Sequence, residues 1–378
     1  MTAGGPAGPP TAWFSHELCF WHDPGAGSGH LPVGPGVEPL RQFAVDPDLR
    51  RAEGLVRLSG VLDRFTRHTP SPAPDADLLL VHTREHVDRV EATSARGGGD
   101  AGVYAPAGHH SAAAARLAVG ACTAAVREVL AGRHRRAYCL VRPPGHHAEP
   151  DRAMGLCLFN NLAVATRVAQ QQGARRVLVV DIDVHHGNGL QRVFWEDPDV
   201  CYVSLHQDGL FPPASGTAAE TGSGAGAGTT MNVPLPAGTG HGGYVAAVES
   251  LVLPAARAFG PDLILVAAGL DAGGHDPMGR MMATSRTFHT IVGALCDLAD
   301  ELCSGRIVLA HEGGYSAWYQ PTLLLSVATA VAGLPAPDDP FLHSLENLPG
   351  QRLTPHQRRV VDHLQARHPL LAAPAVAS

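Results

Sequence analysis

Residues 177–188 read VLVVDIDVHHGN, an apolar run that ends in Asp181, Asp183 and His185. In a strand, side chains two residues apart point to the same side, so these three are expected to project together from the end of a buried strand. Carboxylate and imidazole groups both bind zinc, and a catalytic zinc site combines three protein ligands with one open position. The segment therefore predicts a metal site. A turn in which an aspartate caps the next helix is the alternative.

Apolar runs bounded by turn residues predict strands elsewhere in the chain, and stretches rich in Ala, Leu, Val and Arg predict helices between them. The strands are expected at 78–82, 138–142, 177–183, 200–206, 263–269 and 306–311, and the helices at 50–65, 111–131, 162–172, 242–258, 285–303 and 321–332. Strands that alternate with helices predict an α/β fold with a parallel sheet covered on both faces.

Three more predicted strands are followed by polar loops. These loops read RPPGHH at 142–147, GLDAGGHDP at 269–277 and HEGGY at 311–315. Ligands of parallel α/β sheets bind beyond the carboxyl ends of the strands, so all four loops are expected to converge on one crevice.

The loops carry residues that suit hydrolysis. His146 and His147 can serve as a paired acid and base, since imidazole titrates near neutral pH. Asp271 would be a third metal ligand, with an ordinary surface turn as the alternative. Tyr315 follows a Gly-Gly turn, from which its hydroxyl could reach over a polarised carbonyl.

Length and charge restrict the function further. The 378-residue chain shows no linker, so we expect one domain over 13–371 between disordered tails at 1–12 and 372–378. A net charge of −7 gives no general electrostatic reason to bind nucleic acid or an anionic membrane. The N-terminus lacks the features of a signal peptide and no apolar run approaches the roughly 20 residues that span a bilayer, which predicts a cytoplasmic protein. The chain has no lysine, which excludes Schiff-base catalysis and a P-loop lysine.

In their order along the chain, RPPGHHA, DIDVHHGNG, GLDAGGHDPMG and HEGGY resemble the zinc-dependent histone deacetylase family over about residues 13–333. WHDPG, SLHQD and NVPLPAG are most similar to the bacterial class II histone deacetylase-like amidohydrolases. The resemblance implies the arginase-deacetylase fold, with a central eight-stranded parallel sheet flanked by helices. It places the active site at the carboxyl ends of the strands.

The resemblance also implies the bound metals. Asp183, His185 and Asp271 would hold one Zn²⁺ per chain. A K⁺ ion near the zinc strand is implied as well, bound through Asp181, Asp183, His185, Ser204 and Leu205.

Catalytic roles follow from the same resemblance. His147 would be the general base for the attacking water and then the acid for the leaving amine, while His146, paired with Asp181, would give electrostatic support. Tyr315 would donate a hydrogen bond to the tetrahedral oxyanion. Asn188 stands where many class I members have aspartate, and an amide should raise the basicity of His147 less than a carboxylate would.

The expected substrate channel departs from the family pattern. Phe211 matches one of two aromatic walls, but the usual Gly-Phe-Cys reads Gly155-Leu156-Cys157. We therefore expect a wider or less rigid channel that handles acyl-lysine peptides less well. Met278 stands where polyamine-specific relatives have glutamate, which disfavours a cationic acetylpolyamine.

The leading hypothesis is a zinc-dependent amidohydrolase that removes acetyl or a related acyl group from lysine or a small amine. Its acylated substrate could instead be an acetylpolyamine or a specialised metabolite. A second class of function is an acyl-ligand binding protein that retains the metal without turnover. An arginase-like enzyme with two manganese ions is disfavoured, because the segment from His185 to Gly187 lacks the further aspartate that such sites need. Homo-oligomerisation is left open.

Overall fold

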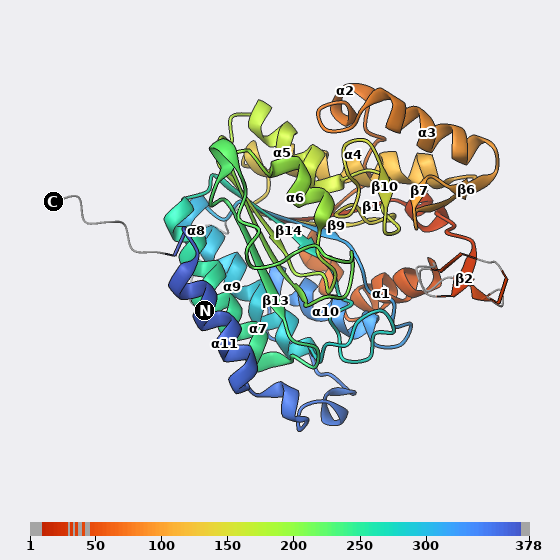
Figure 1. Ribbon diagram of the computed structural model, residues 1–378. Helices are drawn as coiled ribbons and strands as arrows, with labels where there is room; N and C mark the ends of the chain where they lie inside the picture. Colours follow the sequence, from red (N-terminus) through yellow and green to blue (C-terminus); the bar gives the residue numbers. More distant parts are fainter. Residues whose placement is uncertain (1–9, 29–30, 33–34, 37–39, 42–45, 372–378) are drawn as a thin grey trace, which may run out of the picture.

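The computed structural model describes residues 10–28, 31–32, 35–36, 40–41 and 46–371. Its central sheet has eight parallel strands in the order β13-β12-β11-β14-β15-β9-β1-β5 (Figure 1). These are β1 (Thr11–Ser15), β5 (Phe65–His68), β9 (Arg136–Leu140), β11 (Val177–Asp181), β12 (Val200–Gln207), β13 (Thr230–Leu235), β14 (Leu263–Ala268) and β15 (Ile307–His311). The predicted α/β fold with an eight-stranded parallel sheet is therefore confirmed.

Both faces of the sheet are buried, which explains why its central strands are continuous apolar runs in the sequence. In β11, Leu178 and Val180 pack into the core on one face. Val177 and Val179 pack into the core on the other face. The strand is thus fixed from both sides, and its carboxyl end is a rigid base for the residues that follow.

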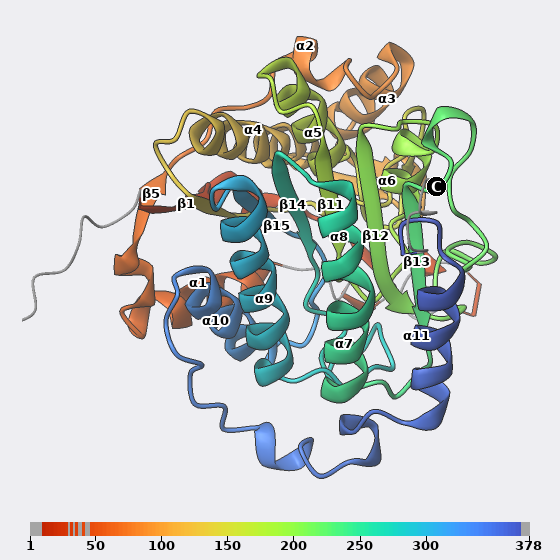
Figure 2. The ribbon, with the colours of Figure 1, turned by 90° about the vertical axis from the view of Figure 1, so that its left-hand side faces the viewer.

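Helices cover the two faces, and Figure 2 shows α7, α8, α9 and α10 on one side of the sheet with α4 and α5 on the other. The first layer contains α1 (Asp46–Leu58), α7 (His241–Ala247), α8 (Leu253–Phe259), α9 (Ser285–Cys303), α10 (Gln320–Val331) and α11 (Pro355–Arg367). The second contains α4 (Ser111–Leu130), α5 (Asn161–Gln171) and α6 (Asn188–Phe194).

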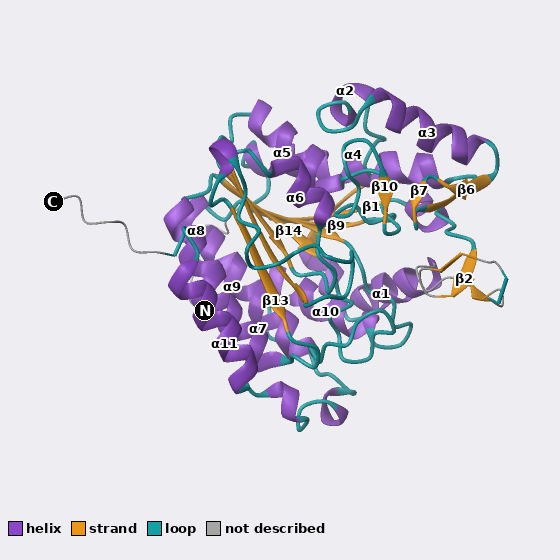
Figure 3. Cartoon of the chain, viewed as in Figure 1, coloured by secondary structure: helices purple, strands orange, loops and turns teal. Residues whose placement is uncertain are grey.

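Shorter elements lie beside this layered body. Helices α2 (Asp75–Leu78) and α3 (Arg84–Ala95) pack over a smaller core that they share with α4 and α5. Figure 3 shows β2, β6, β7 and β10 to one side of the central sheet. In the described ranges the short strands form three small sheets: β2 (Ala26–Ser28) with β3 (Leu31–Pro32) and β4 (Leu40–Arg41), β6 (Gly98–Asp100) with β8 (Pro106–Gly108), and β7 (Gly102–Val103) with β10 (Ala153–Met154).

Four neighbouring strands position the candidate site. Strands β11, β14, β15 and β9 are consecutive in the sheet, and all four run parallel. The loops after them are the four polar loops identified in the sequence. Because the carboxyl ends of these strands share one edge, the loops meet there.

Several predicted elements are wrong. Residues 78–82 form the end of α2 and a turn, because Leu78 is buried beneath helices in the smaller core and does not join the sheet. The helix predicted over 50–65 ends at Leu58, since Gly60 adopts a left-handed conformation with φ of 76° and Phe65 begins β5. The helix predicted over 242–258 is divided into α7 and α8 by a π-helix at Val248–Val252.

The sheet also contains three strands that were not predicted, β1, β5 and β13. Thr11 and Ala12, which were placed in the N-terminal tail, belong to β1. The rest of the two predicted tails, 1–9 and 372–378, lies outside the described residues. Across the described ranges, no helix has both the length and the apolar character needed to cross a bilayer.

Candidate active site

The three predicted metal ligands lie together at the ends of β11 and β14. One donor atom from each of Asp183, His185 and Asp271 falls in a group whose members are all within 4.8 Å of one another. His185 Nδ1 lies 3.0 Å from Asp183 Oδ1 and 3.1 Å from Asp271 Oδ2. Tetrahedral zinc, with bonds of about 2.0–2.1 Å to nitrogen or carboxylate oxygen, would separate its ligand atoms by roughly 3.3 Å. The cluster therefore has the size that such an ion needs.

Backbone amides hold the carboxylates of this cluster in place. The amide of Gly313 donates to Asp183 Oδ2 and that of Val184 donates to Asp271 Oδ1, each at a distance of 2.9 Å. A Cβ at position 313 would collide with both carboxylates, so glycine is required. Asp271 Oδ2 is buried and accepts no hydrogen bond. A buried carboxylate oxygen that accepts no hydrogen bond is costly, and its 3.1 Å contact with His185 Nδ1 is an ion pair only when that imidazole is protonated, so a metal cation at this point would stabilise it.

The charges of the cluster also favour a cation. Burial, followed by the neighbouring Asp183 carboxylate, raises the pKa of Asp271 to about 6. Burial alone would lower the pKa of His185, but the carboxylates of Asp183 and Asp271 outweigh it and raise that pKa to about 10. The site thus attracts positive charge, which a proton or a divalent metal ion can supply.

His147 is linked to a further buried carboxylate through Asn188. Its Nδ1 lies 2.8 Å from Asn188 Oδ1, and Asn188 Nδ2 donates to Glu149 Oε1 at a distance of 2.9 Å. This chain of contacts makes Nδ1 the protonated nitrogen and leaves Nε2 as the acceptor. Burial, then the nearby His146 and His185, hold the pKa of His147 well below its usual value. His147 is therefore neutral and suited to act as a base.

Glu149 is anchored in turn by two arginines. Arg152 Nη2 donates to Glu149 Oε2 over 2.9 Å, and Arg192 also pairs with that oxygen. The Glu149 side chain is buried although both guanidinium groups reach solvent. Glu149 was not among the predicted site residues, even though it lies only two residues after His147.

His146 occupies the position expected beside Asp181. Its Nδ1 lies 3.0 Å from Asp181 Oδ2. Burial lowers the pKa of His146, but the carboxylates of Asp183 and Asp181 overcome this effect and raise it to about 10. The loop that carries His146 is fixed by Glu312, whose Oε2 accepts hydrogen bonds from the amides of Gly145 at 2.6 Å and His146 at 3.1 Å.

Tyr315 reaches the same site from the loop after β15. Its amide donates to Asp276 Oδ2 over 2.7 Å, while Asp276 Oδ1 accepts from the amide of Met278 over 2.8 Å. The half-buried Asp276 carboxylate thus ties the two loops together. Burial, followed by the charges of nearby carboxylates, holds the pKa of Tyr315 well above its usual value, so its hydroxyl keeps its proton.

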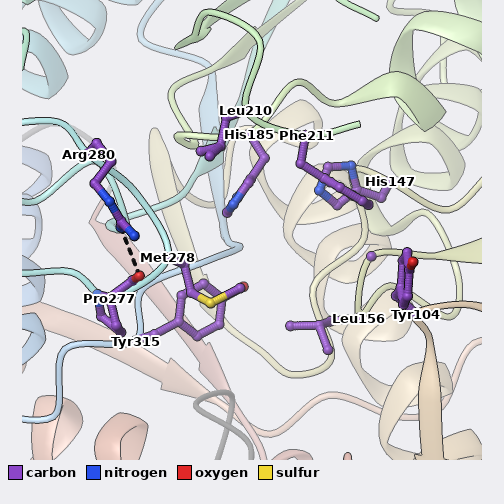
Figure 4. Close-up of a pocket in the computed structure, with 11 residues that line it drawn as sticks. Tyr104, His147, Leu156, His185, Leu210, Phe211, Pro277, Met278, Arg280 and Tyr315 are labelled. Atoms are coloured by element: carbon purple, nitrogen blue, oxygen red, sulfur yellow. Dashed lines mark hydrogen bonds between the residues drawn. The ribbon is translucent and has the colours of Figure 1, made fainter. Parts of the chain in front are cut away.

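A pocket of about 280 Å³ opens over His147, His185 and Tyr315 (Figure 4). All four residues predicted for the substrate channel, Gly155, Leu156, Phe211 and Met278, line it. The remaining lining residues, Tyr104, Leu210, Pro277 and Arg280, were not predicted.

Aromatic rings meet on one side of this pocket. The Phe211 ring lies edge-on to His147, with centroids 5.0 Å apart, and the Tyr104 ring is 6.5 Å from Phe211. Tyr104 therefore adds a second aromatic ring to the channel, although Leu156 has replaced the expected phenylalanine. The amide of Leu156 donates to the carbonyl oxygen of Tyr104 over 2.7 Å, which joins their two loops.

The residues expected to bind K⁺ lie on β11, on β12 and in the loop after β11. Asp181 pairs with Ser204 across these strands. Ser204 and Leu205 are buried, and the Ser204 hydroxyl lies 2.8 Å from His206 Nδ1. The K⁺ site itself stays a prediction.

Comparison with known proteins identifies the family. The histone deacetylase domain model matches residues 48–331. The chain is 42% identical over 369 residues to the histone deacetylase-like amidohydrolase of Pseudomonas aeruginosa, covering 96% of this chain and 97% of that protein. It is 35% identical over 298 residues to a probable deacetylase of Archaeoglobus fulgidus, covering 78% and 81% of the two chains.

A solved structure supports the same conclusion. The crystal structure of the HDA15 HD domain superimposes with a TM-score of 0.83 at 33% identity, covering 96% of this chain and 98% of that one. Its fold and the two sequence comparisons agree with the motifs from which the family was predicted. The chain belongs to the histone deacetylase family.

Proposed function

We propose that the protein is a zinc-dependent amidohydrolase that removes acetyl or a related acyl group from lysine side chains or small amines. Membership of the family makes it a hydrolase of amide bonds. One observation supports the metal-dependent mechanism most directly: the buried oxygen of Asp271 that accepts no hydrogen bond belongs to a three-donor cluster, and the His185 of that cluster lines the same pocket as His147 and Tyr315.

Asp183, His185 and Asp271 would hold the zinc ion. When bound, Zn²⁺ acts as a Lewis acid toward the amide carbonyl and lowers the pKa of water. Two carboxylates and a neutral imidazole are a suitable donor set, and His185 of this set lines the pocket from which a substrate would approach.

The remaining steps fall to the protein's own side chains. His147 Nε2 would accept a proton from water as the water oxygen bonds to the carbonyl carbon, with Asn188 holding the imidazole through Nδ1. The same nitrogen would return the proton to the amine nitrogen as the C–N bond breaks. Tyr315 would donate a hydrogen bond to the oxyanion that forms in between. His146 and Asp181 would stabilise the charge that develops around His147.

A K⁺ ion near β11 and β12 is proposed on the family resemblance alone. Replacing K⁺ by the larger Cs⁺ in the assay buffer would test it, with loss of activity or thermal stability expected if the site is occupied.

The proposed reaction is tested by acetate release from an acetyl-lysine peptide, a monoacetylpolyamine and a small acetamide, with metal content measured on the same sample. We expect one zinc per chain and acetate release from at least one substrate. Tyr315→Phe should retain the zinc and the fold while losing about 100-fold or more in kcat, since one oxyanion donor is worth that much. Bound zinc without acetate release from any acyl amine would instead indicate a binding protein.

A further inference from the structure

Among the described residues that line the active-site pocket, Arg280 is the one that is permanently charged. The other lining residues are aromatic, aliphatic, imidazole or glycine. Figure 4 shows Arg280 and Pro277 on the side of the pocket opposite Leu156 and Tyr104. Arg280 and Pro277 are exposed, whereas His147 and His185 are buried, so Arg280 lies toward the mouth of the pocket.

The contacts of Arg280 leave its charge available. Its Nη1 donates to the carbonyl oxygens of Pro277 at 3.1 Å and Gly279 at 2.6 Å, and its amide donates to Gln207 Oε1 at 2.7 Å. These neutral acceptors hold the side chain in place without cancelling its charge. Within the described part of the chain, no carboxylate forms an ion pair with it. The half-buried Asp276 carboxylate is already bonded to the amides of Met278 and Tyr315.

The orientation of a substrate follows from the proposed function, on which this inference rests. The acyl carbonyl must reach the buried cluster at His185 and Tyr315, so the amine portion of the substrate extends toward the exposed mouth. Any charge carried at the far end of that amine portion would face Arg280. A guanidinium group binds a carboxylate in a planar, two-point geometry and repels an ammonium group.

We infer that Arg280 makes the enzyme selective for acyl amines whose amine portion carries a carboxylate, and selective against acylpolyamines. Met278 strengthens this inference, because the neighbouring position offers a thioether and no carboxylate to attract a cation. Two sources of the carboxylate share this chemistry: the α-carboxylate of a free acylated amino acid, and an acidic side chain beside an acyl-lysine in a peptide.

The direct test compares three acetamides of matched length: ω-acetamidohexanoate, its neutral primary amide, and monoacetyl-hexanediamine. Exposed ion pairs contribute up to about fivefold each, so attraction of the anion and repulsion of the cation together predict a kcat/KM ratio of roughly five- to twentyfold. Arg280→Gln should bring the anion-to-cation ratio to within about twofold, and Arg280→Glu should invert it. Added salt should reduce the wild-type ratio through screening.

Arg67→Gln is the matched control, since Arg67 is exposed on the edge strand β5 and does not line the pocket. It removes the same charge and should preserve the wild-type ratio. Acetyl-lysine peptides with Asp or Asn next to the modified lysine separate the two sources of the carboxylate. A preference confined to ω-acetamidohexanoate would indicate free acylated amino acids, and one shared by the Asp peptide would indicate acidic peptides.

Binding distinguishes failure of this inference from failure of the proposed reaction. Calorimetric titration of the zinc-loaded Tyr315→Phe variant with the three acetamides gives their affinities without turnover. Tighter binding of the anion that is lost on adding Arg280→Gln would support the role of Arg280 even if no substrate were hydrolysed. Equal affinities, or a wild-type charge preference that persists in Arg280→Gln, would overturn it.

Discussion

Gly155→Ala is expected to disable His147, the proposed general base, while leaving the fold largely intact. Gly155 has φ of +55°, and an added Cβ would lie 2.5 Å from His147 Cδ2 and 2.9 Å from Phe211 Cε1. His147 cannot move away freely, because its Nδ1 is bonded to Asn188. The left-handed backbone costs an alanine about 1–2 kcal/mol and the crowding roughly 1–3 kcal/mol. A shift of about 1 Å in a catalytic group costs on the order of 100-fold in rate.

Gly132→Ala separates these two contributions. Gly132 has a similar φ of +71°, but a Cβ there would meet no atom within 4 Å. We expect the left-handed backbone conformation to lower the free energy of unfolding of both variants, measured in urea, by about 1–2 kcal/mol. Only Gly155→Ala should lose further stability and fall about 100-fold in kcat/KM for acetate release. If its kcat/KM stays within about threefold of that of Gly132→Ala, the inferred crowding of His147 is refuted.

Three further outcomes are expected. Leu156→Phe should raise kcat/KM on an acetyl-lysine peptide about two- to tenfold, since a ring at this position can pack on the acyl-lysine chain and on the existing aromatics. The absence of any gain would show that the channel does not need an aromatic ring at position 156. Glu149→Ala should lower kcat about tenfold or more by freeing the Asn188 amide. Glu149→Gln keeps an acceptor and should recover most of the rate. Equal losses of kcat in the two variants would mean that Glu149 does not orient Asn188. Burial lowers the pKa of His82 from 6.5 to about 3. As the pH drops below 6.5, this imidazole is therefore protonated in the unfolded chain but still neutral in the folded one. Its contribution to the free energy of unfolding consequently falls with falling pH. Between about pH 6 and pH 5, His82→Gln should flatten that dependence by about 1.2 kcal/mol. An unchanged slope in urea titrations would contradict the lowered pKa of His82.

The sequence predicts the centre of this protein well because two local rules act together there. Strands buried on both faces are apolar along their length, as in residues 177–180 of β11, and ligands gather at the carboxyl ends of parallel strands. These rules bring Asp183, His185 and Asp271 to one place, and the structure does place them together.

The outer strands gave weaker signals for identifiable reasons. β5 has one buried residue among four, and β13 includes Pro234, which usually argues against a strand within a sheet. Pro234 is tolerated because β13 is the edge of the sheet. The apolar residues near Leu78 were mistaken for a strand because burial beneath helices produces the same pattern over a short run.

The unpredicted site residues depend on long-range contacts. Tyr104 comes from a segment without any motif and meets the channel only through the pairing of its loop with that of Leu156. Glu149 and Arg280 lie close in sequence to recognised motifs. Their importance depends on which partners they reach, Asn188 in one case and the open pocket in the other.

The proposed mechanism requires one zinc ion, held by Asp183, His185 and Asp271, for amide hydrolysis. The most direct measurement is a zinc titration of metal-depleted protein, with bound zinc and acetate release followed together. We expect activity to rise in proportion to bound zinc and to saturate at one equivalent, and Asp271→Asn to bind zinc much more weakly with activity lost in parallel. Three results would contradict this mechanism: full activity without metal, a requirement for two metal ions, or wild-type zinc affinity in Asp271→Asn.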